Sequence, residues 1–293
     1  MESEARPLDR ALFAWRFAGG AADAALVALD GYQNADGGFG QGLEPDVRTP
    51  ASSAIATAIG LADLAELGCP GSDPRVTRAV GYLYATLDPA TQVWRIVPPA
   101  VNDAPHAPWW GDEGNSLVEG FGGFAVNPRA ELVGLLWRYA DLVPRAWLDD
   151  LTERTVASVD GRTLDWHDLL SAGRLVETTD VPDSVRERLL PRLRDEATRL
   201  VGRDVASWEA YGPQPALLAR SPASPFATLF GEALDTNLDY VVERQAASGA
   251  WEPIWSWGPM YPDAWALARR EWSGRLTLDT LTTLRAFGRI EEP

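Results

Sequence analysis

The chain has 293 residues, of which 46% are hydrophobic, so it is long enough to bury a substantial core. It carries 26 basic and 42 acidic residues, and its formal net charge of -16 repels nucleic acids and anionic membrane surfaces. All the basic residues are arginine, which excludes chemistry that needs a lysine, such as a Schiff base or a Walker A phosphate site.

Further absences narrow the class of protein. Cys69 is the only cysteine, so the sequence offers neither a disulfide framework nor a zinc cluster. No signal peptide precedes Leu8, and no apolar run approaches the roughly 20 residues that span a bilayer. No linker divides residues 1–293. We therefore expect a single-domain, soluble, cytoplasmic protein without membrane insertion, whose oligomeric state the sequence leaves open.

In chain order, the hydrophobic spacing predicts a series of helices and almost no strand, which indicates an all-α fold. Gly19 and Gly20 separate the first two helices, and Thr49 and Pro50 have the residue types of a helix cap and a first helical position. The expected helices cover residues 7–17, 21–30, 50–68, 73–87, 127–142, 144–159, 163–177, 182–201, 261–272 and 276–287, with another ending near 245. The long passage 88–126 is expected to be non-helical, and a loop of this length is more often functional or partly disordered than merely connective.

Two loops share the same spacing of a glutamine, a glycine and an aromatic residue. These residues are Gln33, Gly37 and Phe39 in the first loop, and Gln245, Gly249 and Trp251 in the second. The glutamine amide can cap backbone groups of a helix end while the glycine makes a tight turn. Two copies at the same spacing indicate an internal repeat.

This spacing resembles the QW repeat of the terpenoid cyclase and protein prenyltransferase superfamily. The resemblance implies an α/α toroid, a barrel of helical hairpins with an inner and an outer ring of helices. Over nearly its full length the chain is also similar to an uncharacterised bacterial group of toroid proteins. The matching segments are DGGFGQGLEPD at 36–46, HAPWW at 106–110 and WSWG at 255–258. The Asp-x-Asp-Asp acid of the cyclases and the zinc ligands of the prenyltransferases are absent.

Five residues are candidates for acid–base chemistry or for its orientation. Glu44, Asp46 and Arg48 precede the third expected helix, where carboxylates have either a capping and ion-pair role or a catalytic one. In the catalytic reading, a dry aromatic cavity raises the pKa of a carboxyl group, which then donates a proton. His106 and His167 are the only histidines, and each is either a general acid or base or a structural hydrogen-bonding residue.

Thirteen tryptophans are many for this length. Aromatic residues in loops and on one helical face either fill the core or form a cage or stacking platform for a substrate. In the second interpretation, Arg48 and these aromatic residues bind the substrate: Trp109, Trp110, Trp255, Trp257, Tyr261, Trp265 and Trp272.

The favoured function is a small-molecule enzyme of the isomerase or lyase type, similar to a terpenoid cyclase, that acts on an apolar or isoprenoid substrate by acid–base chemistry. A carbohydrate-active or carbohydrate-binding toroid and a non-catalytic protein-interaction scaffold stay open as alternatives. Asp149, Asp150 and Glu153 superficially resemble a metal–diphosphate motif, but acidic residues are usual early in a surface helix. We expect neither a metal nor a cofactor.

Overall fold

The computed structural model describes residues 5–114 and 116–290. Over this part of the chain the protein is all-α, with fourteen α-helices, about 60% helical residues and no strand. Among the described residues, the extended pairing consists of isolated β-bridges, which join Gln33 to Phe39, Phe39 to Ser53 and Val47 to His106. The prediction of an all-α fold is confirmed. None of the helices in these residues combines the length and the apolarity needed to cross a bilayer.

The chain forms two compact units. Unit 1 combines residues 1–28 with residues 194–293, and unit 2 comprises residues 29–193. Each unit has its own buried apolar side chains, such as Leu8 and Trp208 in unit 1 and Leu61 and Trp94 in unit 2. Whether the two units make one domain, as the sequence predicts, stays a prediction.

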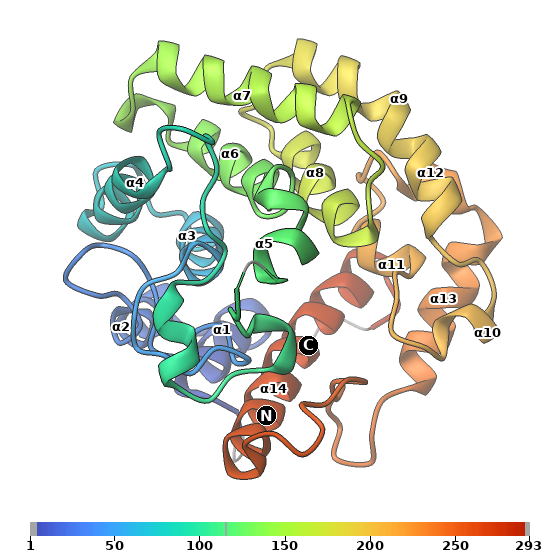
Figure 1. Cartoon of the computed structure of the whole chain (residues 1–293). Helices are drawn as coiled ribbons and strands as arrows, with labels where there is room; N and C mark the ends of the chain where they lie inside the picture. Colours follow the sequence, from blue (N-terminus) through green and yellow to red (C-terminus); the bar gives the residue numbers. More distant parts are fainter. Residues whose placement is uncertain (1–4, 115, 291–293) are drawn as a thin grey trace. The chain divides into compact units, whose positions relative to one another are not determined.

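Unit 2 is built around helix α6, which contacts three other helices. Figure 1 shows α3 and α8 beside α6, with α4 packed on α3 and α7 packed on α6. The start of α9 follows α8, and short helical turns occupy the long passage after α4. The elements are α3 (Ala54–Glu66), α4 (Pro74–Thr86), α5 (Ser116–Gly120), α6 (Arg129–Arg138), α7 (Arg145–Asp160), α8 (Trp166–Glu177), α9 (Asp183–Leu200) and the 3-10 turns η1 (Pro99–Asp103), η2 (Pro108–Trp110), η3 (Gly122–Phe124) and η4 (Ala140–Leu142).

Helix α3 is buried on most of its faces, as its apolar composition predicts. Its small residues let neighbouring elements approach closely. Gly60 is one of them, because a Cβ atom there would lie 2.6 Å from the ring of Phe39. The first of the two similar loops is therefore pressed directly onto α3.

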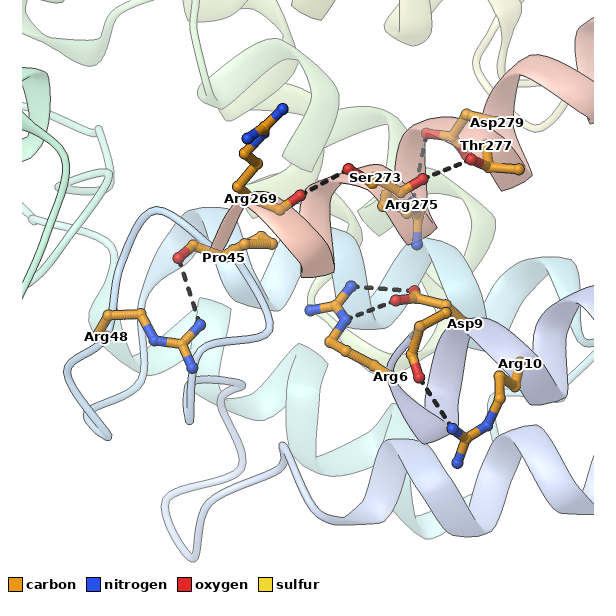
Figure 2. A network of polar contacts seen from close by, with 11 residues as sticks. Arg6, Asp9, Arg10, Pro45, Arg48, Arg269, Ser273, Arg275, Thr277 and Asp279 are labelled. Atoms are coloured by element: carbon orange, nitrogen blue, oxygen red, sulfur yellow. Dashed lines mark hydrogen bonds and ion pairs between the residues drawn. The ribbon is translucent and has the colours of Figure 1, made fainter. Parts of the chain in front are cut away.

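Unit 1 pairs the beginning of the chain with its end. Helix α1 packs against α14, and α11 and α12 pack against α13. At the start of α1, the buried Arg6 guanidinium binds both oxygens of the fully buried Asp9, at 2.8 and 3.1 Å (Figure 2). The elements are α1 (Pro7–Phe17), α2 (Ala22–Asp30, whose last residues belong to unit 2), the end of α9, α10 (Val205–Trp208), α11 (Pro215–Leu218), α12 (Ala227–Phe230), α13 (Glu232–Glu243) and α14 (Pro262–Ala286).

Three predicted helix boundaries are wrong. The helix predicted over 127–142 ends at Arg138, and a separate 3-10 turn, η4, follows it. Helix α3 begins at Ala54, with the Ser53 side chain as its cap, because residues 50–53 instead pair with the loop around Phe39. The last two predicted helices are one continuous helix, α14. The passage 88–126 is also not wholly non-helical, since it contains α5 and three 3-10 turns.

The two loops with similar spacing share their internal hydrogen bonds. In each loop the glutamine side-chain amide donates 2.9 Å to the carbonyl of the glycine four residues later, Gly37 or Gly249. Both glycines have positive φ, at 92° and 80°. The backbone N–H of the aromatic residue then donates to a threonine hydroxyl on a helix, at 3.0 Å from Phe39 to Thr57 and at 3.1 Å from Trp251 to Thr277. Equal spacing in the sequence thus corresponds to equal local geometry.

Candidate functional site

Two distant segments of unit 2 pair, and they carry four of the five candidate acid–base residues, Glu44, Asp46, Arg48 and His106. The Arg48 N–H donates 3.0 Å to the Pro105 carbonyl, and the Ala107 N–H donates 2.9 Å to the Asp46 carbonyl. These bonds flank the antiparallel bridge between Val47 and His106. The segments predicted as candidate sites, LEPD and HAPWW, therefore lie side by side.

The ionisable side chains of this pairing are withdrawn from water. The exposed fractions of Glu44, Asp46 and His106 are 3%, 2% and 6%. The chain that carries the two carboxyl groups turns between Glu44 and Val47, where the Val47 N–H donates 3.1 Å to the Glu44 carbonyl. The Arg48 guanidinium, which is half-buried, donates 3.4 Å to the Pro45 carbonyl (Figure 2). Charged groups are rarely buried so deeply without a role in ion pairing or chemistry.

The backbone fixes which nitrogen of His106 carries the proton in the neutral ring. His106 Nδ1 lies 2.8 Å from the Ala104 carbonyl, which accepts hydrogen bonds and donates none. The neutral imidazole therefore has its hydrogen on Nδ1 and its basic lone pair on Nε2. Gly111 lies beside this atom, since a Cβ there would be 3.5 Å from Nε2.

Of the adjacent residues Trp109 and Trp110, only Trp110 is buried. Its exposed fraction is 5%, and its ring stacks on Phe121 with centroids 5.2 Å apart and planes inclined by 14°. Phe121 in turn contacts Phe124 at 6.0 Å. Trp109 is 39% exposed. The aromatic surroundings of this region thus come from Trp110 and from the glycine-rich segment after it.

His167 lies on another element, in the first turn of α8, and its ring stacks on Trp166 at 3.6 Å. Burial lowers its pKa. The carboxylates beside it hold the backbone: Asp165 caps α8 by accepting from the Asp168 N–H at 2.8 Å, and Asp168 accepts from the Asn127 N–H before α6 at 3.1 Å. Burial, aided by the charge of Asp165, raises the pKa of Asp168 to about 6.

The remaining aromatic candidates belong to unit 1. Trp255 meets Trp272 edge-on at 5.2 Å and Tyr211 at 5.7 Å, and Trp257 meets Trp265 at 5.7 Å. Trp257 is fully buried, whereas Tyr261 is 40% exposed and precedes α14. Unit 1 therefore contains its own aromatic cluster, and the acid–base candidates are all in unit 2.

Asp112 is a buried acidic residue that the sequence did not single out. Its side chain is 7% exposed and binds Arg95 through Oδ2. Its backbone and the Asn102 side chain exchange two hydrogen bonds of 2.9 Å. The only signal in the sequence is its place directly after HAPWW, in a loop rich in turn residues.

The acidic residues that resemble a metal–diphosphate motif form surface ion pairs instead. Asp149 and Asp150 bind arginines four residues away in α7, and Glu153 binds Arg188 of α9. Within residues 5–114 and 116–290, no three His, Cys, Asp or Glu side chains gather as metal ligands would. No family model, curated protein or solved structure matches the chain. What the site does must follow from its own side chains.

Proposed function

We propose that the chain is an acid–base enzyme of the isomerase or lyase type that acts on an apolar, isoprenoid-like small molecule. The observation that supports this is the pairing of residues 46–48 with 105–107, which places the segment of the buried Glu44 and Asp46 beside the segment of the buried His106. A carboxyl group withheld from water is easier to keep protonated. In that form it donates a proton to an alkene, an epoxide or a leaving oxygen.

The proposed roles follow from the hydrogen bonds of each group. Asp46 or Glu44 is the acid, and His106 is the base, because its bond to Ala104 leaves the lone pair on Nε2. Arg48 and the aromatic residues of the site bind the substrate. The apolar rings of Trp110 and Phe121 keep water away from a cationic intermediate and attract it through their π faces.

We infer an α/α toroid as the arrangement that holds this site. Two observations support it: the two loops with the same hydrogen bonds, and the alternating helical pairs of unit 2. In such a barrel, each repeated loop joins one hairpin to the next.

A second candidate function is binding or processing of a carbohydrate. It is supported by unit 1, where Tyr211 is 55% exposed and contacts Trp255. Among the residues that the structure describes, no acceptor lies within hydrogen-bond reach of the buried indole N–H groups of Trp255 and Trp272. Aromatic rings with unused donors are suited to the faces and hydroxyl groups of a sugar.

The substitution Asp46→Asn tests the proposed enzyme. It keeps the shape of the side chain and removes the acidic proton, so the rate should fall about 100-fold or more while the melting temperature stays nearly the same. Purified protein is incubated with linear isoprenoid alkenes, epoxides and alcohols, and the products are measured by mass spectrometry. Asp149→Asn, an exposed residue of α7, is the control and should retain the wild-type rate.

Two results would contradict the acid role. Asp46→Asn could lower the free energy of unfolding by about 1 kcal/mol or more while the activity per folded molecule stays intact, which is the signature of a structural hydrogen bond. Alternatively, the wild-type protein could convert no isoprenoid while sugars raise its melting temperature, which would favour the second candidate.

A further inference from the structure

The loop that carries His106 and Trp110 is closed by residues at its two ends. The Asp112 N–H donates 2.9 Å to the Asn102 side-chain oxygen, and the Asn102 side-chain amide donates 2.9 Å to the Asp112 carbonyl. Arg95 holds Asp112 Oδ2. Within the loop, the backbone N–H of Trp110 donates 2.9 Å to the Ala107 carbonyl, which completes the turn η2. These contacts fix the positions of Trp110 and Asp112 without using the indole N–H of Trp110 or Oδ1 of Asp112.

Two buried polar atoms of this loop have no hydrogen-bond partner in the part of the chain that the structure describes. One is the indole N–H of Trp110, a donor, and the other is Oδ1 of Asp112, an acceptor. Both side chains are more than nine-tenths buried, with exposed fractions of 5% and 7%. Because an unmet buried polar atom costs free energy, an unmet donor and an unmet acceptor on residues two apart in one loop call for an explanation.

Four other buried tryptophans of the same chain meet this requirement within the protein, whereas, among the described residues, the indole N–H groups of Trp255 and Trp272 in unit 1 do not. The indole N–H groups of the four donate to a carbonyl or hydroxyl oxygen at 2.7 to 3.0 Å. These residues and their acceptors are Trp94 with Leu83, Trp137 with Thr152, Trp208 with Gly202, and Trp251 with Val241. Trp110 departs from this pattern beside the proposed acid–base residues.

We propose that Trp110 and Asp112 bind a hydroxyl group of the substrate, and this rests on the proposed function of the site. A hydroxyl group accepts from the indole N–H and donates to the carboxylate, so it satisfies both atoms. A carbonyl or ether oxygen only accepts and would leave Asp112 unmet. An ammonium group only donates and would leave Trp110 unmet. A phosphate or carboxylate group would be repelled by Asp112.

The hydroxyl group has two possible sources, an isoprenoid alcohol or a sugar. Binding is measured by calorimetry with geraniol, with its methyl ether and with glucose. The methyl ether keeps the acceptor oxygen and loses the O–H, so wild-type protein should bind geraniol about tenfold more tightly than the ether. Tight binding of glucose in place of geraniol would identify the sugar as the source and equally support the hydroxyl site.

Two substitutions separate the contributions of the donor and the acceptor. Trp110→Phe keeps the ring that stacks on Phe121 and removes the N–H, so alcohol and ether should both bind about tenfold more weakly. In Asp112→Asn, the amide oxygen turns to Arg95, which can only donate, and the amide NH₂ replaces Oδ1. This variant should lose the preference for alcohol over ether. Trp137→Phe, whose N–H already has an acceptor, is the matched control.

The inference is overturned if wild-type protein binds alcohol and ether equally, if Asp112→Asn keeps the preference, or if neither geraniol nor glucose binds. Equal binding of the alcohol and the ether is the result expected when a water molecule is hydrogen-bonded to both Trp110 and Asp112. Turnover of alkenes and epoxides that depends on Asp46 would then still support the acid–base enzyme. Conversely, a hydroxyl preference that depends on Asp112, without any turnover, would establish the binding site and reject the enzyme.

Discussion

At the start of α8, Asp168 is held in the interior while its carboxylate accepts a hydrogen bond from the Asn127 N–H. Burial, together with the charge of Asp165, raises its pKa from 3.8 to about 6. The folded protein therefore binds this proton more tightly than the unfolded chain does. The resulting stabilisation is complete below pH 3.8 and is lost as the pH rises through about 6.

This titration predicts that Asp168→Asn stabilises the protein at neutral pH. Asparagine still accepts the bond from Asn127 but carries no charge, so the gain at about pH 7 should be on the order of 1–3 kcal/mol. The gain should vanish near pH 4, where the wild-type residue is protonated. Urea unfolding of both proteins across this range measures the difference. An equal difference at every pH, or a pH-dependent gain for the exposed control Asp149→Asn, would refute this explanation.

At the scale of elements, the two repeated loops have the same hydrogen bonds but different surroundings. A Cβ on Gly37 would lie 2.4 Å from the Arg78 carbonyl oxygen, whereas a Cβ on Gly249 would meet nothing within 4 Å. Both glycines have positive φ. The glycine in the first loop is thus required for its conformation and for the close approach of α4, and the glycine in the second loop for its conformation alone.

Alanine at these two positions should separate the two requirements. Gly249→Ala adds only the strain of a left-handed backbone, about 1–2 kcal/mol. Gly37→Ala adds a collision with backbone and should cost about 3 kcal/mol or more. Urea unfolding followed by circular dichroism measures both. Equal losses would mean that α4 moves away without cost. Gly81→Ala, in an exposed part of α4 with open space around it, should instead stabilise by about 0.5–1 kcal/mol.

At the scale of the whole molecule, the chain should need no metal ion. The acidic residues that resemble a diphosphate motif are bound to arginines, and the candidate site consists of carboxyl and imidazole groups that can transfer protons themselves. Treatment with EDTA should therefore leave both the melting temperature and the rate of isoprenoid conversion unchanged. Loss of either one, restored by magnesium or zinc, would contradict this prediction.

Local chemistry in the sequence was enough to predict much of the secondary structure. The helices α1, α4, α7 and α9 lie within a residue or two of their predicted bounds, because caps, prolines and apolar spacing act over a few residues. Asp73 caps α4 as its place before Pro74 predicts. The spacing of Gln33 and Gly37 likewise predicted a tight turn at the glycine, and the structure has a turn there in which Gly37 has positive φ.

Contacts between distant segments decided the rest. Pro50 could have begun a helix, but residues 50–53 bond to the loop at Phe39, and the helix starts later. The predicted break between residues 272 and 276 is absent, and Gly274 lies where α14 passes so close to α1 that a Cβ there would lie 3.0 Å from Asp9.

The candidate site, like the fold, was determined partly by local sequence and partly by contacts between distant segments. The sequence by itself identified Asp46 and His106 as ionisable groups in aromatic surroundings. The pairing of the two segments that carry them, and the burial of the Asp112 side chain, came only with the fold. The physical reason is that hydrogen bonds between residues close in the sequence require particular residue types at fixed spacings. The pairing of segments far apart is chosen by the packing of the whole core.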